Sequence, residues 1–358
     1  MNNRRSFIKQ AGLGLAALHL ERSSPFLQPA PPSFTFDYWL WQRPNLSEEE
    51  SQIKKRFQSY KDAGIRGLMF ENYSRKHFQL AKEIGFEAHR WMWTMNRGEK
   101  ELLENHPEYY AVSRSGKSCA HNPPYVGYYR FLCPSHPDVP PYLEEKAREQ
   151  LEKDDVDGLH LDYIRYPDVI LPVNLWDNYK LDQSAELADY DFCYSKYSKD
   201  AYRKETGIDI DKVARPEQSP SWRAFRYGQI TKVVNRICTA AKDYGKPVTA
   251  AVFPTPDLAR RIVRQDWTQW NLSAVFPMIY HGFYKEPISW IGMAVEEGVK
   301  ALNGKFPLYA GLYLPDFNDL KELDQAIKLA KSKGAAGVSL FGEKEFDTAT
   351  IHMLRTIK

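Results

Sequence analysis

Hydrophobic and polar positions along the chain predict strands and helices in alternation. Eight short segments rich in β-branched and aromatic residues end in polar, Gly or Pro residues, which is typical of buried strands. They span residues 34–41, 66–73, 86–96, 156–167, 247–256, 273–284, 306–316 and 335–346. Helical patterns lie between most of them, and three of these patterns end in glycine, at Gly64, Gly85 and Gly334. We therefore expect an α/β fold of parallel strands joined by right-handed crossovers.

The number of strand–helix units favours a closed barrel over an open sheet. Eight units in a chain of 358 residues predict a (β/α)8 TIM barrel. An open doubly wound sheet would carry a glycine-rich phosphate loop after its first strand, whereas residues 39–44 read WLWQRP. The connections 97–155 and 168–246 are long. We expect them to be insertions after strands 3 and 4 that wall a pocket.

Two helices carry local signals that the structure can test. Ser47 followed by Glu50 predicts a capping box at the start of the first helix, and Gly64 predicts its end. Trp222, Phe225 and Arg226 fall on one face of the helix before the fifth strand. We expect that face to be core, with the arginine in a salt bridge.

Residues 1–32 are predicted to be an export signal and a linker, and residues 33–358 the barrel. Arg4 and Arg5 precede an apolar run over residues 11–20, a pattern similar to twin-arginine signals. The run is too short to span a bilayer, so we expect no integral membrane association of the mature chain. The expected location is the periplasm or the medium. A chance basic N-terminus before an amphipathic helix is the alternative.

The amino-acid composition limits the kinds of ligand that the protein is expected to bind. The net charge of +3 is mild, with no basic cluster, so we expect no nucleic-acid binding. Nine Trp and 22 Tyr residues suit either a large core or a sugar site, because the apolar face of a pyranose stacks on an aromatic ring. Four cysteines lie far apart without a C-x-x-C pair. Free buried thiols are the main expectation, and a Cys119–Cys133 disulfide is the alternative.

The fourth predicted strand carries the clearest candidate for chemistry. In GLHLDYIRYP, residues 158–167, alternation places His160 and Asp162 on one face. Asp162 ends the strand, where TIM barrels hold their catalytic groups, and we expect it to act as a nucleophile or stabilising carboxylate. Arg165 is expected to hold it ionised, since a nearby positive charge lowers a carboxyl pKa. His160 is expected to orient a neighbour by hydrogen bonding.

The other predicted strand ends are also polar or aromatic. Cleavage of a glycosidic bond uses two carboxyl groups across a cleft, and four residues are candidates for the second: Glu343, Glu71, Asp316 and Glu286. Candidate substrate-binding residues come from the same strand ends. They are Trp39, Trp41, Asn72, His89, Trp91, Trp93, His160, Arg165, Tyr280, His281 and Tyr313. Satisfied polar layers inside the barrel are the alternative interpretation of this set.

Three segments together resemble a known family. VDGLHLDYIRYP, residues 156–167, is the most specific, and YRFLCPSHPDV at 129–139 and RQDWTQWNLSAVFPMIYHGFY at 264–284 support it. The chain is similar over residues 33–350 to the glycosyl-hydrolase-like family 10 proteins, predicted TIM-barrel glycosidases distantly similar to the hydrolase domain of poly-N-acetylglucosamine-processing enzymes. The resemblance implies a glycoside-cleaving barrel with Asp162 as a catalytic carboxylate. It supplies no substrate.

Our sequence hypothesis is a glycoside hydrolase that acts on a poly- or oligosaccharide without a cofactor. A carbohydrate-binding barrel without catalysis is the first alternative, because the second acid is not evident. The second alternative is a metal-dependent hydrolase or deacetylase that uses His160, Asp162 and His281. The sugar, the linkage and the oligomeric state stay open.

Overall fold

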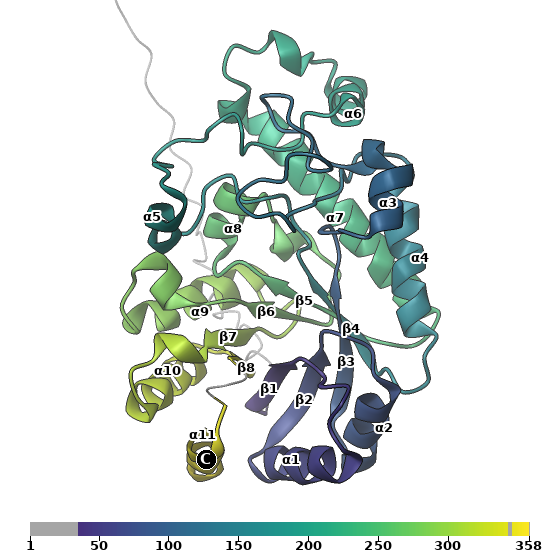
Figure 1. Ribbon diagram of the computed structural model, residues 1–358. Helices are drawn as coiled ribbons and strands as arrows, with labels where there is room; N and C mark the ends of the chain where they lie inside the picture. The colour runs from purple at the N-terminus through teal and green to yellow at the C-terminus, as the bar shows by residue number, and fades with distance from the viewer. Residues whose placement is uncertain (1–34, 343–345, 358) are drawn as a thin grey trace, which may run out of the picture. The chain divides into compact units, whose positions relative to one another are not determined.

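The computed structural model describes residues 35–342 and 346–357, which form a ring of eight parallel strands with helices around it (Figure 1). This confirms the expected TIM barrel. The strands are β1 (Asp37–Gln42), β2 (Ile65–Phe70), β3 (Glu87–Trp93), β4 (Gly158–Asp162), β5 (Val248–Val252), β6 (Ala274–Pro277), β7 (Tyr309–Tyr313) and β8 (Gly337–Phe341). Each lies inside or within one residue of a predicted segment, and all eight are shorter than predicted.

Helices follow the strands and cover the outside of the ring. The α-helices are α1 (Glu50–Asp62), α2 (Arg75–Ile84), α3 (Lys100–Asn105), α4 (Val139–Leu151), α5 (Trp176–Tyr179), α6 (Lys196–Thr206), α7 (Pro220–Lys242), α8 (Pro256–Val263), α9 (Ser289–Leu302), α10 (Leu320–Ser332) and α11 (Thr348–Thr356). Short 3₁₀ helices are η1 (Pro107–Tyr109), η2 (Val173–Leu175), η3 (Ile210–Lys212), η4 (Pro216–Gln218), η5 (Trp267–Gln269), η6 (His281–Tyr284) and η7 (Leu314–Asp316).

Strand pairing closes the ring almost completely. The hydrogen-bonded order is β6-β5-β4-β3-β2-β1-β8-β7, and every pair is parallel. Two single parallel bridges, Val275–Leu308 and Met278–Gly311, join β6 to β7. Because the carboxyl ends of parallel strands meet at one rim, the ring gathers their last side chains there.

Large side chains fill the inside of the barrel, and glycines on neighbouring strands make room for them. A Cβ atom on Gly67 would lie 2.2 Å from the ring of Trp39, and one on Gly158 would lie 2.7 Å from His89 Nε2. Trp39 packs edge-on against His89, with ring centroids 5.2 Å apart. The interior below the rim is therefore a packed core and not a channel.

The segments after β3 and β4 are the longest connections of the ring. Residues 94–157 hold α3, η1 and α4, and residues 163–247 hold α5, α6 and α7 with three 3₁₀ helices. Figure 1 shows α3, α5 and α6 on the same side of the ring. Among the described residues, no helix combines the length and hydropathy that a membrane span requires. The predicted export signal and linker lie outside the described residues.

Two local predictions differ in outcome. The capping box is wrong: α1 begins after Glu49 without a side-chain cap, and Ser47 instead donates to Asn45 Oδ1 from its backbone N–H at 3.2 Å and its hydroxyl at 2.8 Å. Asn45 competes for Ser47 because both lie in the turn before the helix. All four cysteines are buried and free, as expected.

The buried face of α7 is confirmed and holds an ion cluster. Trp222 and Arg226 are fully buried, and Arg226 Nη1 lies 2.5 Å from Asp191 Oδ1. Arg264 Nη2 approaches the same oxygen at 3.5 Å. Burial disfavours the ionised form of Asp191, but Arg226 and Arg264 outweigh it and hold its pKa below the usual range. This cluster ties the segment after β4 to α7 and to the end of α8.

We predict that Asp191→Asn lowers the free energy of unfolding by about 3–5 kcal/mol, because the fully buried guanidinium of Arg226 loses its negative partner and Arg264 keeps only Glu186. Urea denaturation at neutral pH measures the loss. The loss should shrink as the pH falls through the acidic range, since the wild-type carboxylate is then also neutralised. Asp189→Asn is the matched control, because Asp189 pairs with Lys117 at the surface. Equal stability of the two variants would contradict the role of the cluster.

Candidate active site

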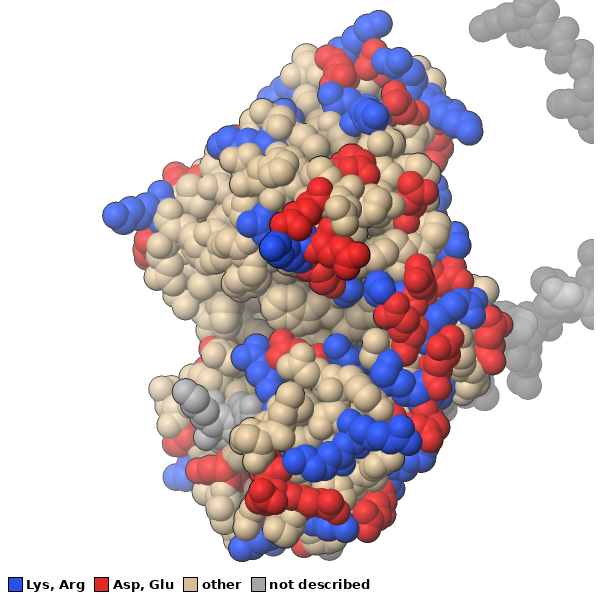
Figure 2. Space-filling view, turned by 45° about the vertical axis from the view of Figure 1, so that its right-hand side comes forward, with Lys and Arg blue, Asp and Glu red and all other residues tan. Residues whose placement is uncertain are grey.

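A pocket of about 250 Å³ opens at the carboxyl ends of the strands. Its lining comes from the ends of β1, β3, β4, β5, β6 and β8 and from the segments that follow them. Figure 2 shows a hollow in this face of the molecule whose floor is mostly uncharged. Most lining residues are aromatic or aliphatic, and two carboxylates, Asp162 and Asp168, lie among them.

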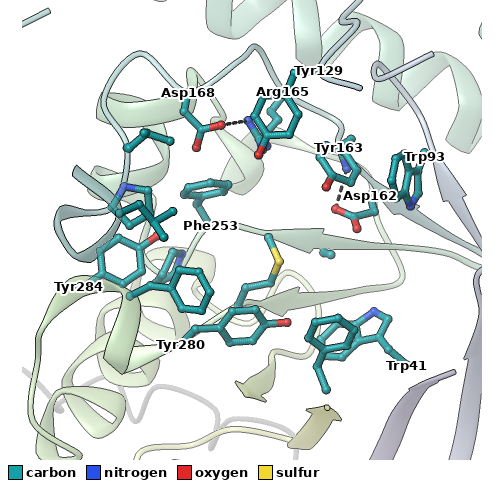
Figure 3. A pocket seen from close by; sticks show the side chains of 18 of the residues that line it. Trp41, Trp93, Tyr129, Asp162, Tyr163, Arg165, Asp168, Phe253, Tyr280 and Tyr284 are labelled. Atoms are coloured by element: carbon teal, nitrogen blue, oxygen red, sulfur yellow. Dashed lines mark hydrogen bonds and ion pairs between the residues drawn. The ribbon is translucent and has the colours of Figure 1, made fainter. Parts of the chain in front are cut away.

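Asp162 is held in the pocket by two N–H donors from neighbouring elements. Trp91 Nε1 on β3 donates to Oδ2 at 2.9 Å, and the backbone N–H of Tyr163 donates to Oδ1 at 2.6 Å. Tyr163 has a φ of 48°, in the left-handed region that non-glycine residues rarely adopt. Figure 3 shows Asp162 and Tyr163 beside Trp93. The carboxyl group therefore has a fixed orientation and little access to water.

The protonation of Asp162 differs from the sequence expectation. Burial raises its pKa above the usual range, even though both N–H donors and the Arg165 charge favour the ionised form. Arg165 thus acts in the expected direction, but desolvation outweighs it. The environment keeps a proton on Asp162 to a higher pH than on an exposed aspartate.

Arg165 pairs with a different carboxylate, which the sequence analysis missed. Its Nη1 lies 2.8 Å from Asp168 Oδ2, and both side chains are almost fully buried. Figure 3 shows this pair apart from Asp162 along the pocket. Burial raises the pKa of Asp168, and Arg165 opposes that effect. The one sequence signal for Asp168 is its position three residues after Arg165, directly behind the fourth strand.

His160 lies one layer below Asp162 and orients Trp41, as expected. Trp41 Nε1 donates to His160 Nε2 at 2.9 Å, so His160 Nδ1 carries the proton and faces Thr249 Oγ1 at 2.9 Å. Burial lowers the pKa of His160 well below its usual value, and the ring is neutral. Both ring nitrogens are occupied, which leaves neither for a metal ion in the pocket.

The pocket brings together six of the sequence-predicted site residues. Trp41, Trp91, Trp93, Asp162, Arg165 and Tyr280 line it. Trp93 and Asp162 are direct register partners on β3 and β4, and Tyr280 follows β6 on the opposite wall. Burial and the nearby Asp162 raise the pKa of the Tyr280 hydroxyl, which stays protonated.

Three predicted substrate-binding residues are absent from the pocket lining and lie in the barrel core. Trp39 is 3% exposed, and His89 and His160 are fully buried. His89 Nε2 lies 2.9 Å from Glu87 Oε1 below the rim. We correct their role from substrate binding to support of the barrel core. Alternation along a strand gives the face on which a side chain lies but not its depth in the barrel.

The three described candidates for the second carboxylate lie outside the pocket lining. Glu71 pairs with Arg43 at 2.5 Å. Asp316 accepts the backbone N–H of Gly282 at 3.0 Å and lies 3.8 Å from His281. Glu286 is exposed in the connection after η6. Glu343 lies outside the described residues.

The remaining predicted residues also lie outside the pocket lining. Asn72 is exposed after β2, and Tyr313 packs against Tyr280 with centroids 5.3 Å apart. His281 is buried beside Asp316. Within residues 35–342 and 346–357, no group of three or more His, Cys, Asp and Glu side chains is placed to hold a metal ion.

Comparison with known proteins identifies the family. The model of the family described as Glycosyl hydrolase-like 10 matches residues 50–312. The chain belongs to this family. The match confirms the resemblance found in the sequence and includes Asp162, Arg165 and Asp168. No curated protein matches the chain.

Solved structures share the fold at low sequence identity. The β-amylase catalytic domain of Paenibacillus polymyxa has a TM-score of 0.61 at 11% identity, over 90% of this chain and 99% of that one. A GH42 β-galactosidase of G. stearothermophilus has a TM-score of 0.61 at 11% identity, and the match covers 91% of this chain and 56% of that one. A β-galactosidase of Halorubrum lacusprofundi has a TM-score of 0.58 at 11% identity, and the match covers 86% of this chain and 52% of that one. This chain thus spans about half the length of the two galactosidases. At such identities the similarity shows the fold alone.

We predict that Trp91→Phe raises the pKa of Asp162 further, because the carboxylate loses an N–H donor. Carboxyl ¹³C NMR of the Asp-labelled protein, titrated with acid and base, measures the change. Trp93→Phe is the matched control, since Trp93 lines the same pocket without a hydrogen bond to Asp162. An unchanged Asp162 titration in Trp91→Phe would contradict the assigned contact.

Proposed function

We propose that the protein is a glycoside hydrolase that cleaves a glycosidic bond in a poly- or oligosaccharide, with Asp162 as the catalytic carboxyl group. The observation that carries this proposal is the carboxyl group of Asp162 itself. It lies in the pocket, is oriented by two N–H donors, and forms no ion pair with any described residue. Family membership supports the same reaction class.

The raised pKa favours a proton-donor role for Asp162. Cleavage breaks the bond between the anomeric carbon and the bridging oxygen, and that oxygen needs a proton as it leaves. A buried carboxylic acid supplies it at a pH where an exposed aspartate is already ionised. This differs from the nucleophilic or stabilising role expected from the sequence, and its physical reason is the desolvation of the site.

Asp168 is our candidate for the second carboxyl group. Of the acidic residues that the structure describes, only Asp162 and Asp168 line the pocket. Burial raises the pKa of Asp168, but the Arg165 guanidinium at 2.8 Å favours its ionised form, and in that form Asp168 can act as a base toward water or a nucleophile toward the anomeric carbon. The anomer of the first product separates these two uses, because inversion needs the base and retention the nucleophile.

The aromatic walls suit a sugar ring. Trp41, Trp91 and Tyr280 line the same pocket as Asp162, and Trp91 donates to its carboxyl group. Aromatic faces pack against the apolar faces of pyranoses while polar groups bind the hydroxyls. The hydrogen bond from Trp41 to His160 fixes one of these rings in place. This wall supports a carbohydrate as the substrate class.

Asp162→Asn tests the function. We expect kcat on the best glycan of a defined panel to fall by about 10²–10⁴-fold, because the amide cannot donate the proton. Isothermal titration calorimetry should show that the variant still binds that glycan. Asp316→Asn is the discriminating comparison, since Asp316 is a half-buried carboxylate outside the pocket. Full activity of Asp162→Asn, or loss only in Asp316→Asn, would contradict the assignment.

One observation favours a second candidate, a barrel that binds carbohydrate without cleaving it. Asp168 is already paired with Arg165 and is therefore less available as a base. Under this alternative, the wild-type protein binds a glycan of the panel but releases no reducing ends from it over long incubation. The same assay on the wild-type protein thus decides between the two candidates.

We also propose that residues 1–32 direct export to the periplasm or the medium, on the support of the sequence pattern alone. Replacing both Arg4 and Arg5 with Lys should retain the protein in the cytoplasm, because the receptor recognises the arginine pair. Cell fractionation and immunoblotting measure the distribution. Unchanged export of the double variant would contradict a twin-arginine route.

A further inference from the structure

An aromatic pair extends from the pocket onto the surface of the segment after β3. Trp93, at the end of β3, lines the pocket, and its ring centroid lies 6.1 Å from that of Tyr128. Tyr128 is also 5.2 Å from Tyr129, which lines the pocket too. Two neighbours of Tyr128 therefore face the candidate catalytic cavity, while Tyr128 lies beyond it.

Tyr128 is unusually open to solvent for a residue of its size. It is 53% exposed and is the only aromatic among the large hydrophobic side chains that are exposed in the described part of the chain. Scattered exposed apolar residues are ordinary on protein surfaces. Tyr128 differs from them because it continues an aromatic wall that begins inside a pocket.

The backbone under Tyr128 is fixed before any ligand arrives. Asn96 and Phe131 form an antiparallel bridge, and Asn96 Oδ1 accepts the backbone N–H of Arg130 at 2.8 Å. Arg130 O in turn accepts the backbone N–H of Arg97 at 2.9 Å. The segment that carries Tyr128 is thus tied to the end of β3. A ligand that stacks on Tyr128 pays little conformational entropy for ordering this segment.

We propose that Trp93 and Tyr128 form a sugar-stacking subsite outside the catalytic pocket, which holds a further unit of the oligosaccharide whose scissile bond lies at Asp162. This rests on the proposed function and adds that the substrate is a chain and not a monosaccharide with a small aglycone. Continuity with the pocket identifies the occupant, because a glycan that leaves the cavity past Trp93 meets Tyr128 next. A pyranose offers the apolar face that such rings bind.

Binding by chain length tests the subsite. Asp162→Asn prevents turnover, and in this background the affinity for defined glucan, galactan, xylan and amino-sugar oligosaccharides of two to six units is measured by calorimetry. We expect affinity to rise with length, and Tyr128→Ala to reduce that gain on the order of tenfold, because one stacking contact is lost. Tyr128→Phe should keep the gain. Met293→Ala, which removes an even more exposed apolar side chain from α9, should also keep it.

The outcomes separate the two proposals. A gain with length that disappears only in Tyr128→Ala supports the subsite. A gain that is the same with and without the Tyr128 ring overturns the subsite and leaves the proposed function standing. If no oligosaccharide of the panel binds to the Asp162→Asn protein or to the wild-type protein, both proposals fail. Thermal unfolding of each variant confirms that the surface substitutions leave the fold intact.

Discussion

The pairing of β3 with β4 is the constraint on which the site depends. Trp93 lies opposite Asp162 and Trp91 opposite His160 in this register. The indole of Trp91 reaches the carboxyl group only because both side chains point into the barrel. A slip of one residue would turn every one of these side chains to the outer face, where helices pack. The chemistry of the pocket is thus fixed by backbone hydrogen bonds between two neighbouring strands.

The two carboxyl groups of the pocket are held by different interactions. Asp162 is oriented by neutral N–H donors and desolvated, which favours its protonated form. Asp168 is desolvated as well, but it faces the guanidinium of Arg165. The segment that carries Asp168 is held against α7 by the buried pair of Asp191 and Arg226. Burial raises the pKa of both groups, and the guanidinium of Arg165 opposes that rise more directly at Asp168, where it forms an ion pair, than at Asp162.

The sequence predicted the strands and the position of Asp162 because period-2 alternation and strand-end polarity are local signals. It did not reveal Asp168, since a residue in a loop after a strand has no periodic pattern to mark it. It also placed His89 at the rim, because alternation does not indicate how deep in the barrel a side chain lies. Glu71 looked available until the structure placed Arg43 beside it. Pairing across distant segments is a property of the fold and not of the local pattern.

Both carboxyl groups of the pocket come from one stretch, residues 162–168, with Arg165 between them. Under the proposed function, the reactive groups therefore form a single block behind one strand. Loops that follow the other strands contribute walls and no acid among the described residues. If the proposed function holds, substitutions in those walls can change which glycan is admitted while the block stays intact, whereas a single insertion between residues 162 and 168 would displace one acid relative to the other.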